Sequence, residues 1–122
     1  MELCNVYTPN KVRDREMVNG LVAAYESGDD VRKVVVVVYS DEYHAISGSH
    51  RVEAMKRVFG RMEAIEDLED YIIVVDSNDL DLSSDAIEFL DSVRNGSRDE
   101  SRLGSLVACL PSEARAAMDD QV

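Results

Sequence analysis

The stretch that decides the fold spans residues 34–55 and reads VVVVVYSDEYHAISGSHRVEAM. Its first six residues, Val34–Tyr39, form a continuous apolar run of mostly β-branched side chains, which predicts a central strand buried on both faces. A polar turn follows, and Tyr43–Ile46 predicts a second strand that returns as a hairpin. Gly48 ends that strand, and apolar residues then recur at helical spacing up to about Gly60. The chain is therefore expected to pass from hairpin to glycine turn to helix within a few residues.

Further helices and one more buried strand are expected outside this stretch. The spacing of apolar residues predicts a short strand at 3–7 and a buried strand at 71–75. Caps and the same spacing predict a helix from Asp14 to Gly28, which Asn19 and Gly20 weaken, and a helix from Ser83 or Ser84 to Gly96. An amphipathic helix is expected over 103–110, and a last short helix after Pro111. The predicted fold class is α+β, a small mixed sheet with flanking helices, followed by an acidic helical C-terminal segment. We expect residues 1–78 to form the core and residues 79–122 to form a helical extension packed on the same domain.

Length and composition describe an ordinary globular domain. The chain has 122 residues, of which 45% are hydrophobic and 31% are charged, and this suits a single core. No apolar run approaches the roughly 18 residues of a membrane span, so no membrane association is expected. Cys4 and Cys109 form no C-x-x-C pair, and the chain starts with no basic, then apolar leader. We therefore expect a cytoplasmic protein with neither a disulfide nor a zinc site.

The net charge of -12 is concentrated in the second half of the chain. Residues 1–61 contain as many basic as acidic residues, whereas residues 62–122 contain four Arg and sixteen Asp or Glu. An acidic surface repels a phosphate backbone, so direct binding to DNA is not expected. The acidic residues could instead contact a host protein.

The glycine turn carries the most informative chemistry in the sequence. The N–H groups at a helix start are unpaired and create a partial positive charge, so a cationic side chain placed there costs about 0.3–1 kcal/mol. His50 and Arg51 occupy that position, together with the hydroxyl of Ser49. A bound phosphate would offset the cost, because N–H groups and cations would surround it. The alternative is that Arg51 pairs with Glu53 or Asp41 and that the serine only caps the helix.

Residues 48–54, Gly-Ser-His-Arg-Val-Glu-Ala, resemble the G-x-H-R-x-E-A signature of the ParB/sulfiredoxin superfamily. Upstream, Pro9, Asn10 and Arg13 resemble the Pro/Arg box of ParB-like N-terminal domains. The expected order of helices and strands around the signature also matches that superfamily. The resemblance covers roughly residues 3–80 and implies a ParB/sulfiredoxin-like fold.

The resemblance also implies a nucleotide-binding site. In that superfamily the turn and helix start bind the phosphates of a nucleoside triphosphate, CTP or ATP, with Mg²⁺ in several branches, and members act as NTPases, nucleases or kinases. By position, the phosphate-binding residues would be Arg13, Gly48, Ser49, His50 and Arg51. Glu53 would be the candidate catalytic residue, orienting Arg51 or the metal ion, and a salt bridge on the helix surface is its alternative role. No metal ligand is assigned.

Two departures from the superfamily narrow the function. Sulfiredoxins need a nucleophilic cysteine where this chain has Ser49, and a serine lacks sulfur redox chemistry, so sulfinic acid repair is not expected. Chromosome-segregation ParB proteins carry a downstream helix-turn-helix and a dimerisation tail, for which this chain is too short. The expected function is a stand-alone ParB-like nucleotide-binding domain of phage or plasmid type, acting as a weak NTPase or nuclease. The alternative is a non-enzymatic acidic phage or plasmid protein that binds and inhibits a host nucleic-acid-binding protein through residues 62–122.

Two other features are expected to be structural. The segment Asp76–Asp81 departs from the EF-hand template, because Leu80 takes a ligand position and Asp81 replaces the glycine. A solvated acidic loop is expected there, with a loose metal contact by Asp76 as the alternative. His44 is expected to be half-buried and hydrogen-bonded.

Overall fold

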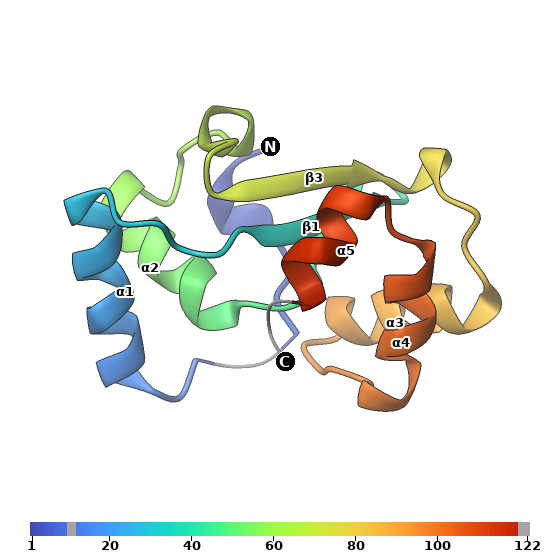
Figure 1. Ribbon diagram of the computed structural model, residues 1–122. Coiled ribbons are helices and arrows are strands. Elements are labelled where there is room, and N and C mark those ends of the chain that lie inside the picture. The colour runs from blue at the N-terminus through green and yellow to red at the C-terminus, as the bar shows by residue number, and fades with distance from the viewer. Residues whose placement is uncertain (10–11, 120–122) are drawn as a thin grey trace.

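The middle of the sheet is formed by β1 (Val34–Tyr39), as Figure 1 shows. β2 (Glu42–Ala45) pairs with β1 antiparallel through a two-residue turn, and β3 (Ile72–Asp76) pairs with β1 in parallel on the other side. The computed structural model describes residues 1–9 and 12–119, and over these residues it shows an α+β fold with three strands and five α-helices. The predicted α+β class with a small mixed sheet is therefore confirmed.

The helices lie on both sides of the sheet (Figure 1). Their bounds are Arg15–Ser27 for α1, Ser49–Phe59 for α2, Ser84–Arg94 for α3, Glu100–Cys109 for α4 and Ser112–Asp119 for α5, with short 3₁₀ turns at Leu3–Asn5 (η1), Ile65–Leu68 (η2) and Ser77–Asp79 (η3). Among the described residues, no helix combines the length and the apolar character that crossing a membrane requires.

β1 is shared by two hydrophobic cores. Successive strand residues point to opposite faces, and β1 accordingly contributes Val34 and Val36 to one core and Val35 and Val37 to the other. The first core also contains residues of α1 and α2, and the second contains residues of α3, α4 and α5. The arrangement is a three-layer one, with the sheet in the middle. The prediction that Val34–Tyr39 forms a central strand buried on both faces is confirmed.

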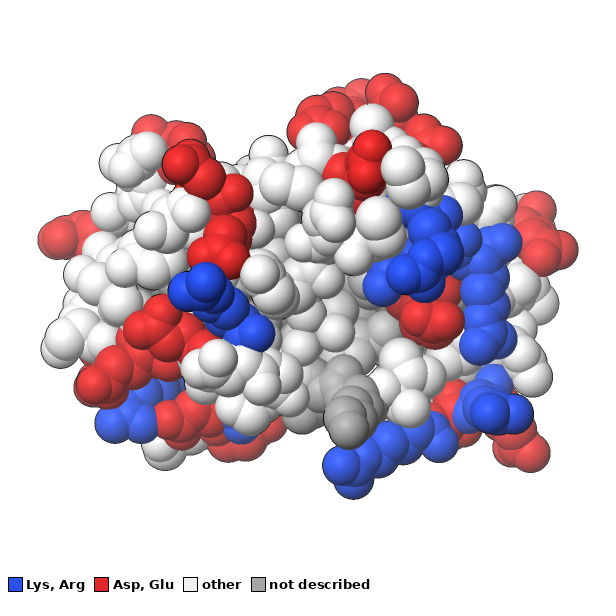
Figure 2. All heavy atoms as spheres, turned by 180° about the vertical axis from the view of Figure 1, so that it is seen from behind, with Lys and Arg blue, Asp and Glu red and all other residues white. Residues whose placement is uncertain are grey.

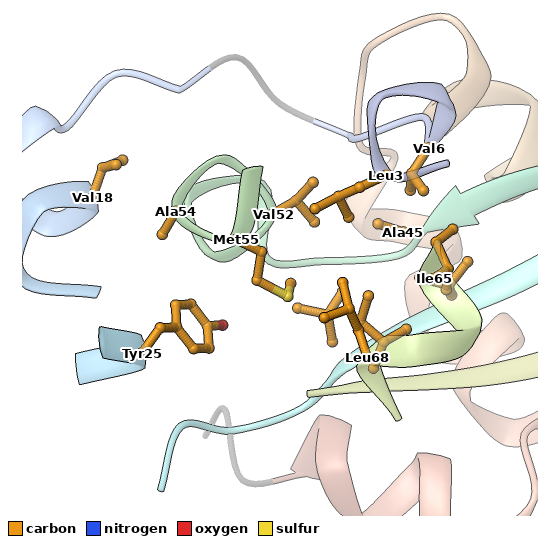
Figure 3. Packing of buried hydrophobic residues seen from close by; sticks show 13 residues of the cluster. Leu3, Val6, Val18, Tyr25, Ala45, Val52, Ala54, Met55, Ile65 and Leu68 are labelled. Atoms are coloured by element: carbon orange, nitrogen blue, oxygen red, sulfur yellow. The ribbon is translucent and has the colours of Figure 1, made fainter. Parts of the chain in front are cut away.

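The first core holds α1 against α2 (Figure 3). From α1, Val18 and Tyr25 are buried in it. From α2, Ala54 and Met55 are buried in the same core, and Leu3 of η1 packs there as well. This packing fixes the position of α2, whose first turn contains the candidate site.

The two outer edges of the sheet differ. The edge of β2 is covered by the N-terminal segment, where the N–H of Tyr7 donates to the carbonyl of Tyr43 at 2.9 Å. On the same edge the N–H of Ala45 donates to the carbonyl of Tyr7 at 2.9 Å. The outer edge of β3 pairs with no strand within residues 1–9 and 12–119. The described sheet therefore has one covered edge and one open edge.

The prediction of a strand at residues 3–7 is wrong. Leu3–Asn5 forms the 3₁₀ turn η1, and only residues flanking it make isolated bridges. Glu2 bridges Ala64, and Tyr7 bridges His44. Because these two partners belong to different segments, the chain turns between them instead of continuing as one strand.

Local capping sets the ends of the helices, as predicted. The Asp14 side chain accepts a hydrogen bond from the N–H of Met17 at 3.0 Å, and Gly28 ends α1 in the left-handed conformation. The Ser83 hydroxyl accepts from the N–H of Ala86 at 3.2 Å at the start of α3. These predicted boundaries are confirmed.

Gly20→Ala is expected to stabilise the protein. Gly20 lies inside α1, and a Cβ at this position would meet nothing within 4 Å, so alanine should raise the free energy of unfolding by about 0.5–1 kcal/mol through its higher helix propensity. Gly28→Ala is the matched contrast, because its φ is 72° and a left-handed alanine costs about 1–2 kcal/mol. Urea unfolding followed by circular dichroism measures both changes. A destabilised Gly20→Ala variant would contradict the prediction.

Candidate functional site

The candidate site is the elbow between β2 and α2. The left-handed backbone of Gly48, with a φ of 84°, turns the chain out of the hairpin, and this residue is the N-cap of α2. Glycine adopts this conformation without steric cost. No side chain of the described residues caps α2, and its first turn holds no acidic residue. The N-terminus of α2 thus keeps its partial positive charge without a nearby carboxylate in the first turn to offset it.

The side chain of Arg51 folds back over this elbow. Its Nη1 donates to the backbone carbonyls of Arg32 at 2.9 Å and Lys33 at 3.0 Å. Its Nη2 lies 3.4 Å from the hydroxyl oxygen of Ser47, to which it donates. The guanidinium lies against Gly48, where a Cβ would be 2.8 Å from Nη2. Position 48 therefore favours glycine for its backbone conformation, and a Cβ there would push the guanidinium out of its present position. Arg51 joins the segment before β1 to the start of α2.

The side chain of His50 joins a second segment to the same elbow. Its Nε2 lies 3.3 Å from the backbone nitrogen of Asp14 and 3.4 Å from that of Arg13, and it accepts from these N–H groups. The start of α2 and the segment before α1 are thereby held together. The backbone of Arg13 thus lies beside His50, whereas its side chain is exposed. The phosphate-binding role that the resemblance implies for Arg13 stays a prediction. Asn10 of the predicted box, like residues 120–122 of the predicted extension, lies outside the described residues.

The positive charges at the elbow have no carboxylate partner. In the part of the chain that the structure describes, neither Arg51 nor Arg32 forms an ion pair. Burial lowers the pKa of Arg51, and the nearby charge of Arg32 lowers it further. The alternative in which Arg51 pairs with Glu53 or Asp41 is therefore wrong. Since charges removed from water are normally paired, this cation is suited to a negatively charged ligand.

A buried hydroxyl lies within the electrostatic reach of the same cation. Burial raises the pKa of Tyr25 to about 12, and the charge of Arg51 acts in the opposite direction. The hydroxyl oxygen of Tyr25 has no hydrogen-bond partner among the described residues. Buried tyrosine hydroxyls usually find one. A buried hydroxyl without a hydrogen-bond partner is compatible with a ligand that brings a polar group close to Tyr25.

The candidate catalytic residue Glu53 lies on the surface of α2. Its Oε1 is 3.6 Å from Nε of Arg57, in an i,i+4 salt bridge. This is the alternative role that the sequence left open for Glu53. Ser49 is buried in the first turn. Within residues 1–9 and 12–119, no three His, Cys, Asp or Glu residues come together as metal ligands.

The acidic segment after β3 forms the short turn η3. The N–H of Asn78 donates to Oδ1 of Asp76 at 2.9 Å. Asp76 and Asp41 both line a pocket of about 230 Å³ beside the hairpin turn. These two carboxylates are not joined by a third His, Cys, Asp or Glu among the described residues. The loose metal contact by Asp76 stays an untested alternative.

Arg32 and Lys33 belong to the elbow although the sequence did not indicate them. They contribute backbone carbonyls, which every residue possesses, so side-chain patterns carry no signal for this contact. The same segment lines a pocket of about 520 Å³ together with Ile73 of β3 and Ala117 of α5. α5 also approaches the elbow directly, because Sδ of Met118 lies 3.7 Å from the hydroxyl oxygen of Ser47.

Comparisons with known proteins identify no relative of this chain. No protein-family model matches it, and searches among curated proteins and among solved structures give no match. The resemblance of residues 48–54 to the ParB/sulfiredoxin signature therefore stays a prediction, and the site is interpreted from its own geometry.

Gly48→Ala and Arg51→Ala are expected to be energetically coupled. Alone, Gly48→Ala combines a left-handed strain of about 1–2 kcal/mol with a clash against the guanidinium. In the Arg51→Ala background only the strain remains. A double-mutant cycle in the free energy of unfolding should therefore give an interaction energy of about 1 kcal/mol. Urea unfolding of the four proteins measures this energy.

Gly96→Ala is the matched control for this cycle. Gly96 also has a positive φ, 79°, but a Cβ there would meet nothing within 4 Å. Its cost should be the same with and without Arg51. Strictly additive costs at positions 48 and 51 would show that the guanidinium does not restrict position 48.

His44 is a core residue. Its side chain is 1% exposed, its Nδ1 lies 3.2 Å from the carbonyl oxygen of Val37, and its ring stacks on Tyr7. Burial lowers the pKa of His44, while the Val37 carbonyl and the charge of Glu42 act in the opposite direction. The expectation of a hydrogen-bonded histidine is confirmed, although His44 is more deeply buried than predicted.

Stability is expected to fall as the pH falls from about 7 towards 5. The unfolded chain protonates His44 near its ordinary pKa of about 6.5, whereas the folded state does so only at lower pH. The unfolded state therefore binds the proton first, and the free energy of unfolding drops by at most about 1.4 kcal/mol per pH unit for this group. Urea unfolding across this range measures the slope. His44→Gln should flatten it, and an unchanged slope in that variant would count against the assignment.

Proposed function

We propose that this protein binds a phosphate-bearing ligand at the elbow formed by residues 48–51. The observation that carries the proposal is the guanidinium of Arg51, which is partly removed from water and has no carboxylate partner among the described residues. Its Nη1 is occupied by two carbonyls, but carbonyl dipoles do not neutralise a full charge. The partial charge at the start of α2 and the charge of Arg32 add to the same positive region.

The ligand class we propose is a nucleoside triphosphate, CTP or ATP. This class follows from the resemblance of residues 48–54 to the ParB/sulfiredoxin signature. A pocket of about 520 Å³ is lined by Arg32 and Lys33 and also by the acidic residues Asp30 and Glu113, but by none of residues 48–51. Its volume lies within the size range of small-molecule sites. Arg13, which His50 holds beside the elbow through backbone hydrogen bonds, would add a further cation.

Mg²⁺ would enter this site with the phosphates. Mg²⁺ commonly keeps several water ligands and is bound through phosphate oxygens with only one or two carboxylates. This fits a described chain in which no three potential metal ligands come together. The proposal covers binding alone, because Glu53, the candidate for a catalytic role, is paired with Arg57.

Isothermal titration with CTP, ATP and GTP, with and without Mg²⁺, tests the proposal. At least one nucleotide is expected to bind, and Arg32→Ala should weaken binding about tenfold or more, because a charge-assisted contact is lost. Arg32 is the preferred position, since its exposed side chain can be removed while its carbonyl still accepts from Arg51.

Arg61→Ala is the matched control. It makes the same change in charge at the other end of α2, roughly 16 Å away along a helix of this length, and should leave the affinity unchanged. If no nucleotide binds under any condition, or if Arg32→Ala binds as well as Arg61→Ala, the proposal is wrong.

A further inference from the structure

The outer edge of β3 presents backbone hydrogen-bonding groups. Val34 lies opposite Ile72 in the parallel pairing, and the N–H of Val34 donates to the carbonyl of Tyr71 at 2.9 Å. Backbone groups alternate between the two sides of a strand. The groups of every second residue from Tyr71 therefore face β1, whereas those of Ile72 and Val74 face outward. Within the described residues, no strand pairs with this outward side.

A groove of about 320 Å³ lies beside this edge, between β3 and the start of α5. The apolar residues that line it are Ile73, Val74, Val75, Leu80, Pro111 and Ala114. The side chain of Val74 is 45% exposed, although it is apolar. An apolar groove next to an open strand edge can receive alternate side chains of an added strand.

The charged lining of this groove is entirely acidic. It consists of Asp76, Asp79 and Glu113, and no Lys or Arg of the described chain lines it. Figure 2 shows that the larger group of Lys and Arg side chains lies on the side of the molecule that carries α1 and α2, away from α3 and α4. The groove therefore matches a positively charged segment.

The same charges disfavour a second copy of this chain as the occupant. Natural edge strands are often protected by Lys, Pro or a bulge, and Ile72–Asp76 contains none of these. Pairing two copies through β3 would bring two acidic grooves together in a chain with a net charge of -12, and like charges facing each other are destabilising. The acidic groove thus restricts the edge to basic partners.

We propose that the open edge of β3 binds an extended segment of a partner protein in which apolar residues alternate with Lys or Arg. The outward N–H and C=O of Val74 pair with the backbone of that segment, as in other cases of strand addition. Its apolar side chains enter the groove. Alternate side chains of a strand point to opposite faces, so the cations that face Asp79 and Glu113 of the groove are those at the ends of the segment, where it is no longer paired with β3. Residues 48–51 take no part in this contact, but Ile73 and Glu113 line both the groove and the pocket of about 520 Å³ proposed for the nucleotide. The two proposals are therefore tested with separate ligands and separate variants.

Fluorescence anisotropy with a labelled peptide of four Lys-Val repeats, blocked at both ends, tests the proposal. A Glu-Val repeat of equal length has the same strand propensity and the opposite charge, and a Lys-Gly repeat has the same charge without the apolar side chains. The Lys-Val peptide is expected to bind, and more weakly as salt is raised from about 50 to 500 mM. Each comparison peptide should bind at least about tenfold more weakly.

Variants of Val74 test the backbone contact. Val74→Pro removes an N–H that faces away from β1, as proline in natural edge strands does, and should weaken binding about fivefold or more. Val74→Thr keeps this N–H and is the matched control. In the unchanged protein, amide hydrogen exchange should show that the peptide protects Val74, and this readout decides the matter if Val74→Pro fails to fold.

Variants of the acidic residues test the charge contact. Asp79→Asn combined with Glu113→Gln should weaken binding about twofold to tenfold at low salt. Glu26→Gln, an exposed change on α1, should leave it unchanged. Arg32→Ala should also leave peptide binding unchanged, which separates this proposal from the phosphate site.

Three results would overturn the proposal. They are equal binding of the three peptides, no added protection of the Val74 amide when the peptide is present, and a folded Val74→Pro variant with unchanged affinity. A dimer in solution that Val74→Lys converts to monomers would also overturn it, because a second copy would then occupy the edge.

Discussion

The hydrogen bonds from the Arg51 guanidinium to the carbonyls of Arg32 and Lys33 are the interaction on which the middle of the molecule depends. They join the segment entering β1 to the first turn of α2, and in this position the guanidinium lies where a Cβ of residue 48 would be. His50 adds the segment before α1 to the same point. The carbonyls accept from Nη1 of the arginine but do not balance its charge. The structural role of Arg51 and the anion binding that we propose for it thus involve the same side chain.

β1 connects this elbow to the rest of the fold. Because alternate valines of β1 enter the two cores, the helices on each face are packed against the same strand. The positive elbow and the acidic groove beside β3 are therefore attached to one rigid sheet. Their opposite charges are the basis of the two separate binding proposals, and each surface is formed by elements that the cores hold in place.

Local chemistry made much of the fold predictable. The apolar run Val34–Tyr39, the N-caps at Asp14 and Ser83 and the glycine at position 28 each act within a few residues, so the sequence pattern contains the necessary information. The turn at Leu3–Asn5 could not be predicted in this way, because it results from bridges to two distant segments. For the site, the sequence indicated residues 48–51 but not the inward course of Arg51. The acceptors of its hydrogen bonds are main-chain carbonyls, which every residue has, so the sequence does not indicate them. The groove at β3 could not be predicted either, because it depends on where α5 packs.

The order of the strands also has a consequence for how the chain folds. β1 and β2 are neighbours in sequence, whereas β3 joins β1 only after α2 and η2 have been passed. Closing that long connection costs more chain entropy than closing the hairpin. The hairpin and the helices are therefore expected to form early. The short apolar strand Ile72–Asp76 is expected to pair with β1 last. During that interval two refolding chains can meet through this segment, so dilution should improve the yield of refolded protein.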